Sequence, residues 1–101
     1  MLESIEKARL DKQEKMALEY ALSDIRDEAY LFGSRIDPNK KGGDIDLLIY
    51  SQADPLRLSR RIVLKFFEKC EEKIDVIVMD PDNLSEDQQS FLNTISTLRI
   101  R

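Results

Sequence analysis

Three aspartates within apolar runs constrain this chain more than any other feature of its sequence. Asp44 and Asp46 open the run that ends at Tyr50, and Asp75 lies inside the run 73–79. Because side chains alternate across a β-strand, Asp44 and Asp46 project from the same face, about 6.6 Å apart. Aspartate is depleted in strands and costly to desolvate, so three such positions require a compensating partner. We expect that partner to be a divalent cation, which binds carboxylate oxygens.

A Gly33-Ser34 dipeptide precedes these acids and follows the apolar segment 28–32. Gly33 permits a backbone conformation that a β-carbon would hinder. Ser34 is predicted to be the N-cap of a short helical turn, whose free backbone N–H groups would meet an anion. Taken alone, the dipeptide is also typical of an ordinary turn. Residues 36–43 are rich in Pro, Asn, Lys and Gly and are predicted to form a loop.

Apolar periodicity predicts an α/β fold, a small mixed β-sheet with flanking helices. We expect three or more strands, with the helices largely on one face of the sheet and the acid-bearing face open. Alternating apolar positions predict strands, and apolar positions at helical spacing predict helices. The predicted strands are 28–32, 45–50 and 73–79, and the predicted helices are 3–27, about 55–71 and 85–97.

Two of the predicted helices carry further signals. In the first, we expect the second half to pack on the sheet through Leu18, Leu22 and Ile25, and the charged first half to be more exposed. The last helix should begin with a capping box formed by Ser85 and Gln88.

Two groups of basic residues, one on the middle helix and one in the loop, each allow two interpretations of their role. The middle helix carries a ridge opposite its apolar side, formed by Arg57, Arg60, Arg61 and Lys65. This ridge either attracts phosphate or an acidic partner, or is a solvated face balanced by nearby glutamates. Lys40 and Lys41 in the loop either approach phosphates or are simply solvated.

Length and composition predict a single soluble domain over residues 1–101, which is 42% hydrophobic and 36% charged. We expect no signal peptide and no membrane span, and the lone Cys70 is consistent with a reducing cytoplasm. Histidine is absent, which excludes Ser-His-Asp and Cys-His catalysis and leaves metal chemistry with oxygen ligands. The net charge of −4 argues against nucleic acid as the principal partner.

The order Gly-Ser-x9-Asp-x-Asp, followed by an aspartate on a strand, resembles the nucleotidyltransferase superfamily of the DNA polymerase β type. Within it, the chain is most similar to the minimal nucleotidyltransferase (MNT) proteins. The matching segments are 31–35, 44–49 and 74–78, and the resemblance extends over residues 28–80.

The resemblance implies a polymerase β-like core that uses Mg²⁺, as two ions, and ATP as substrate. Asp44, Asp46 and Asp75 would be the catalytic residues and the metal ligands. Gly33, Ser34 and Arg35 would bind the nucleotide. The implied reaction moves AMP from ATP to an acceptor. We expect the acceptor to be a hydroxyl group of a protein partner, because a chain of this size leaves no residues for a domain that binds a smaller acceptor. MNT proteins of this size commonly accompany a small helical HEPN protein, as the antitoxin of a toxin–antitoxin pair.

Two other functions remain open at this point. In the first, the chain is a non-catalytic antitoxin that acts by contact. In the second, it is a nucleotidyltransferase for a small molecule and works as a homodimer in which each subunit closes the other's cleft.

Overall fold

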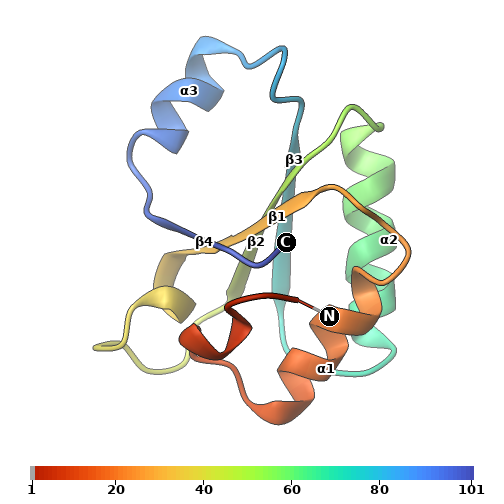
Figure 1. Cartoon of the computed structure of the whole chain (residues 1–101), viewed down its shortest axis with the longest axis vertical. Helices are drawn as coiled ribbons and strands as arrows, with labels where there is room; N and C mark the ends of the chain where they lie inside the picture. The colour runs from red at the N-terminus through yellow and green to blue at the C-terminus, as the bar shows by residue number, and fades with distance from the viewer. Residues whose placement is uncertain (1) are drawn as a thin grey trace.

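The computed structural model describes residues 2–101, and its centre is a mixed sheet of four strands in the order β3-β2-β1-β4 (Figure 1). β1 pairs antiparallel with both β2 and β4, whereas β2 and β3 are parallel. The predicted α/β class and mixed sheet are confirmed. The elements are η1 (Ile5–Lys7), α1 (Lys12–Ala21), β1 (Glu28–Phe32), η2 (Gly33–Ile36), β2 (Ile45–Tyr50), α2 (Pro55–Phe67), β3 (Ile74–Met79), α3 (Glu86–Leu92) and β4 (Thr97–Arg99).

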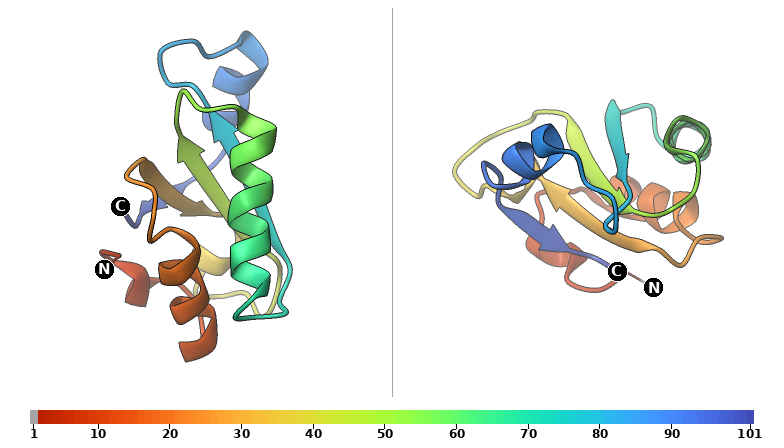
Figure 2. Two further views of the ribbon diagram at one scale, coloured as in Figure 1. Left: turned by 90° about the vertical axis from the view of Figure 1, so that its right-hand side faces the viewer. Right: turned by 90° about the horizontal axis from the view of Figure 1, so that it is seen from above.

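Helices α1 and α2 cover one face of the sheet, as the two views in Figure 2 show. The strands supply alternate residues such as Leu31, Leu47 and Ile49 to this core, and α2 supplies Ile62 and Phe66. Since these side chains are almost fully buried, removing their apolar surface from water is the main stabilising term of the fold. α2 also provides the crossover between the parallel strands β2 and β3, which a short hairpin cannot make.

The opposite face of the sheet carries the acids where β2 and β3 begin and apolar side chains beside and beyond them. Phe32, Leu48 and Met79 form this apolar part, and α3 packs on it through Phe91 and Leu92. The rings of Phe32 and Phe91 meet edge to face, with their centroids 5.7 Å apart. α3 therefore covers the apolar part of this face and leaves the acidic end accessible.

The N-terminal segment differs from the predicted helix over 3–27. Only Lys12–Ala21 is α-helical, because Asp11 and Glu14 form a capping box that starts α1 at Lys12. The segment before α1 is predicted to be exposed, and this prediction is wrong. The segment buries Leu2, Ile5, Ala8 and Leu10. It is held along the sheet by backbone hydrogen bonds from Glu3 to Ile100 and from Arg9 to Arg35.

The C-terminal segment also differs from its prediction. The capping box of Ser85 and Gln88 is confirmed, but the helix ends at Leu92 and residues 97–99 form the edge strand β4. β4 pairs with β1 and places Leu98 against the main core. Pairing satisfies the backbone groups along the outer edge of β1, which a helix to residue 97 would have left without partners in the sheet.

The last turn of α2 also ends earlier than predicted, at Phe67. Within residues 2–101, none of the helices combines the length and the apolar character required to span a bilayer.

Candidate active site

Asp46 and Asp75 lie side by side on the acidic end of the sheet. They are direct register partners across the parallel pair β2–β3, so their α-carbons are separated only by the spacing of neighbouring strands, about 4.8 Å. Both alternate with residues of the main core and therefore point to the face opposite α1 and α2. The alternation of the sequence predicted these faces, and the parallel register brings the two acids together.

The carboxyl group of Asp46 is partly buried, and its pKa is raised. Burial is the largest cause, followed by the negative charges of Asp75 and Asp44, while Lys73 acts in the opposite direction. Each cause is a consequence of placing several carboxylates at one end of a sheet. A cation bound between them would remove this repulsion.

Asp44 lies immediately before β2, and its carboxylate pairs with the ammonium group of Lys73 at 3.3 Å. The hydrogen bond to Asp44, with its charge and that of Asp75, raises the pKa of Lys73. Both side chains are exposed, so this ion pair contributes little to stability. Lys73 was not among the predicted site residues, because a lysine at the start of a strand carries no signal of its own.

Gly33 brings the Gly-Ser turn against the acids. Its φ of +77° is in the left-handed region that favours glycine, and an added β-carbon would lie 3.3 Å from Cγ of Asp46 and overlap its Oδ2. Ser34 lies inside η2, whose N-cap is Phe32, so the prediction that Ser34 is the N-cap is wrong. The Ser34 hydroxyl instead lies against Gly43, where a β-carbon would overlap it.

Arg35 is buried, and each of the three nitrogens of its guanidinium group donates within the protein. It donates two hydrogen bonds to the carboxylate of Glu14, at 2.9 and 3.0 Å. It also donates to the carbonyl oxygens of Gly43 and Arg9. In this arrangement Arg35 positions the loop that follows Gly33, and a direct contact between Arg35 and nucleotide stays a prediction.

Arg9 holds the same loop from outside, and sequence reasoning missed it. Its guanidinium donates to the carbonyl oxygens of Ser34, Asp37 and Gly42, at 2.7 to 3.0 Å. A single arginine in a charged segment does not predict such contacts, because they join residues more than 20 positions apart. Arg9 and Arg35 together fix the loop between Gly33 and Asp44 at both of its ends.

The donor set of the site has the chemistry that Mg²⁺ prefers. Asp46 and Asp75 supply adjacent carboxylate oxygens, and Asp44 is a third carboxylate at the same end of the sheet. Over residues 2–101 the structure gathers no three acidic or cysteine side chains into a ready ligand group. The side chain of Asp44 is turned to Lys73. The oxygen donors therefore fit a divalent cation, and Lys73 pairs with one of the two carboxylate oxygens of Asp44.

A hollow of about 550 Å³ adjoins Gly33, between the η2 loop and the segment after α3. Lys40 lines it, together with Ile36 and Ile95. Lys40 thus lines the same hollow as Gly33, and the interpretation that this lysine approaches phosphate stays a prediction.

Comparison with known protein families agrees with this geometry. The model of the family described as nucleotidyltransferase domain matches residues 10–95, which contain η2, β2, β3 and all three acids. No curated protein matches the sequence. The family match covers most of the chain, so the protein belongs to the nucleotidyltransferase domain family, within the polymerase β-like superfamily.

Proposed function

We propose that this protein is a Mg²⁺-dependent nucleotidyltransferase that moves AMP from ATP to a hydroxyl group of a protein partner. One observation carries the proposal. Gly33, with no side chain and a left-handed backbone, lies directly against the carboxylate of Asp46, which is itself beside Asp75. The accessible backbone of such a turn can bind the phosphates of a nucleoside triphosphate, and the paired carboxylates beside it can bind the accompanying metal ions.

The proposed chemistry needs little covalent participation by the protein. Bound Mg²⁺ would supply positive charge that neutralises the phosphate oxygens and helps to align the attacking hydroxyl. Asp46 and Asp75 would hold the metal, and Asp44 would complete the set. The acceptor oxygen attacks the α-phosphorus of ATP, the bond to pyrophosphate breaks, and the hydroxyl proton passes to water. Gly33 and Ser34 would position the triphosphate, while Arg9 and Arg35 keep their loop in place.

The accessibility of the acids favours a macromolecular acceptor. Asp44 and Asp75 are exposed, and Asp75 lies on β3, an edge strand of the sheet. A site at an open edge offers few walls to enclose a small molecule, whereas a folded partner can complete it. We place the protein with the MNT antitoxins, acting in the cytoplasm on a small helical HEPN-type toxin, and a tyrosine hydroxyl is the acceptor that we propose.

A second function is favoured by one observation. The Asp44 carboxylate is engaged by Lys73, and the acids are not drawn together into a ligand group among the described residues. That arrangement is also what a binding module without catalysis would retain. Such a protein would neutralise its partner by contact alone.

Radiolabelled ATP separates these functions. The protein is incubated with Mg²⁺, its co-purified partner and ATP labelled on the α-phosphate, and the label is followed by gel electrophoresis. The proposal predicts label on the partner that is lost with EDTA or with Asp46→Asn. A parallel reaction with ATP labelled on the γ-phosphate should leave the partner unlabelled, and label transferred in that reaction would indicate a kinase instead. A partner that stays unlabelled while remaining bound would support the contact function.

A further inference from the structure

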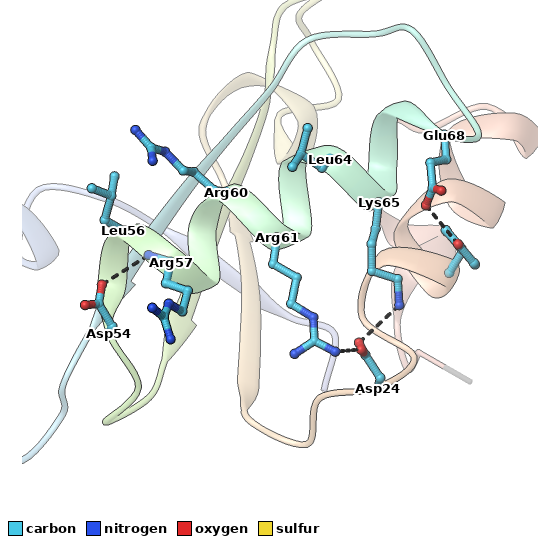
Figure 3. A pocket seen from close by; sticks show the side chains of 10 residues that line it. Asp24, Asp54, Leu56, Arg57, Arg60, Arg61, Leu64, Lys65 and Glu68 are labelled. Carbon is cyan, nitrogen blue, oxygen red and sulfur yellow. Dashed lines mark hydrogen bonds and ion pairs between the residues drawn. The ribbon is translucent and has the colours of Figure 1, made fainter.

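The outward side of α2 carries an unusual concentration of exposed apolar side chains. Four large hydrophobic side chains are exposed among residues 2–101, and three of them are on α2: Leu56 at 60%, Leu64 at 67% and Phe67 at 46%. Single exposed leucines are normal, but here two of them share one row of a helix. Leu56, Arg60 and Leu64 are four residues apart and form one ridge (Figure 3).

A second row beside this ridge is basic. Arg57, Arg61 and Lys65 extend from the other side of α2 in Figure 3, where Arg61 and Lys65 reach Asp24 in the segment after α1. Together with the leucine ridge they line an open hollow of about 970 Å³. The hollow therefore combines apolar and cationic surface on a protein whose net charge is −4.

The carboxylates that line this hollow already have partners within the protein. Asp24 pairs with Arg61 and Lys65, and Asp54 caps the backbone of α2. Glu68 accepts a hydrogen bond from Tyr20. Among the described residues, no carboxylate pairs with the guanidinium of Arg57 or Arg60. These two cations are the charges that the hollow offers to a partner.

We propose that this surface docks an acidic amphipathic helix of a partner protein. A ridge of residues four apart packs into the grooves of a second helix, so apolar side chains of the partner would lie on Leu56 and Leu64. Its carboxylates would meet Arg57 and Arg60, which form strong, oriented hydrogen bonds with carboxylates.

Two other occupants fit less well. A second copy of this surface would bring like charges together across the contact. Single-stranded nucleic acid is usually bound by stacking on free aromatic rings, but Lys65 and Lys69 already lie over the ring of Tyr20, each 4.8 Å from its centroid. The exposed leucines would also gain nothing from phosphate.

The docking surface extends to β3, the edge strand that carries Asp75, whose side chain points to the other face of the sheet. A second hollow, of about 440 Å³, lies between α2 and β3, and it is lined by Arg60 and Leu64 as well as by Asp75. A helix seated on the leucine ridge would thus bring its own protein to the edge strand that carries Asp75. This last step, delivery of the acceptor, rests on the proposed function, whereas the docking does not.

Fluorescence anisotropy with a designed peptide tests the docking. The probe is a labelled, soluble helical peptide of about the length of α2, with leucines on one side and glutamates flanking them. A peptide of the same composition in scrambled order is the control ligand. We expect the helical peptide to bind the full chain, and Leu64→Glu or Arg60→Glu to weaken it at least about fivefold. Lys12→Glu, an exposed charge reversal on α1, should leave its affinity unchanged.

A charge-reversed pair of protein and peptide, together with NMR chemical shifts of the backbone amides, completes the test. The double variant Arg57→Glu/Arg60→Glu should prefer a peptide in which lysines replace the glutamates. Amide NMR shifts caused by the original peptide should map to α2, and the unbound variants should keep wild-type spectra elsewhere. Equal binding of the scrambled peptide, shifts confined to another element, or tighter binding of an oligonucleotide at α2 would each overturn the inference. Because peptide binding requires no transfer, its result is independent of whether AMP transfer is found.

Discussion

The backbone of Gly33 lies directly against the carboxylate of Asp46, and only the absence of a side chain on Gly33 allows this contact. A β-carbon there would overlap Oδ2 of the Asp46 carboxylate. The contact arises because Phe32, the residue before Gly33, is the register partner of Asp46 across β1 and β2. Two motifs separated by more than ten residues in the chain are thereby joined, which gives the Gly-Ser turn a place beside the acids.

Gly33→Ala should weaken the binding of Mg-ATP about tenfold or more, an effect of about 1.4 kcal/mol or more. The β-carbon would displace the Asp46 carboxylate from the turn. Gly42→Ala is the matched control, because Gly42 also has a positive φ, of +63°, but open space around its β-carbon position. Both variants should lose stability from backbone strain, about 1–2 kcal/mol each. Titration calorimetry on folded protein measures the difference, and equal affinities would remove Gly33 from the nucleotide site.

Asp46→Asn should stabilise the protein at neutral pH in the presence of EDTA. The raised pKa of Asp46 means that the folded state holds this proton more tightly than the unfolded state does. The ionised carboxylate therefore destabilises the fold above the raised pKa. This effect disappears as the pH falls below the ordinary aspartate pKa of about 3.9, where both states are protonated.

Urea denaturation of the wild type and the variant across this pH range gives the measurement. The advantage of the asparagine variant should grow as the pH rises through the pKa of folded Asp46 and then level off. Glu71→Gln, at an exposed position outside the helices and strands, is the control and should not be stabilised at neutral pH. A variant that is less stable than the wild type at neutral pH would show that the carboxylate is structural.

Glu14→Ala should cost about 3–5 kcal/mol of stability, since it leaves the buried guanidinium of Arg35 without its partner. It also removes the capping box of α1. The double variant Glu14→Leu/Arg35→Met should be less destabilised than the single one, because it removes both buried charges. Glu19→Ala, on the same helix, should change the free energy of unfolding by only about 0.5 kcal/mol. Equal losses for Glu14→Ala and Glu19→Ala would mean that the ion pair does not hold the loop.

Lys73→Gln should leave Mg-ATP binding intact or tighten it. In the structure Lys73 pairs with one carboxylate oxygen of Asp44, and its positive charge beside the acids opposes the binding of a cation. Lys12→Gln, at an exposed position on α1, controls for the loss of one positive charge. If Lys73→Gln instead weakened the binding of Mg-ATP well beyond Lys12→Gln, Lys73 would be a nucleotide-binding residue.

Much of the sheet could be predicted from sequence because alternation reports directly on burial. Ile45, Leu47 and Ile49 are buried on one face as predicted, and Asp46 lies on the other. The strand β4 was missed because Thr97–Arg99 is too short for a pattern of its own. It exists because the edge of β1 offers backbone partners, which is a property of the folded sheet.

Long-range polar contacts could not be read from the sequence. The bond between Arg35 and Glu14 joins residues 21 positions apart, and it gives Arg35 a role in positioning the loop that its place in the sequence does not indicate. The N-terminal segment was misjudged for a similar reason. Its charged residues suggested an exposed helix, but Arg9 is directed to the loop carbonyl oxygens, and Ile5 and Leu10 are buried.

Intact mass spectrometry of the partner tests the proposed transfer most directly. The protein is expressed together with its small helical partner, as the wild type and as Asp46→Asn. Loss of a metal ligand should reduce transfer by at least about 100-fold, since even residues that only orient such ligands commonly cost 10–100-fold. We predict a partner heavier by one or more AMP units with the wild type and of unchanged mass with the variant. A partner neutralised equally by both proteins, with no change in mass, would contradict catalysis and leave a protein that acts by binding alone.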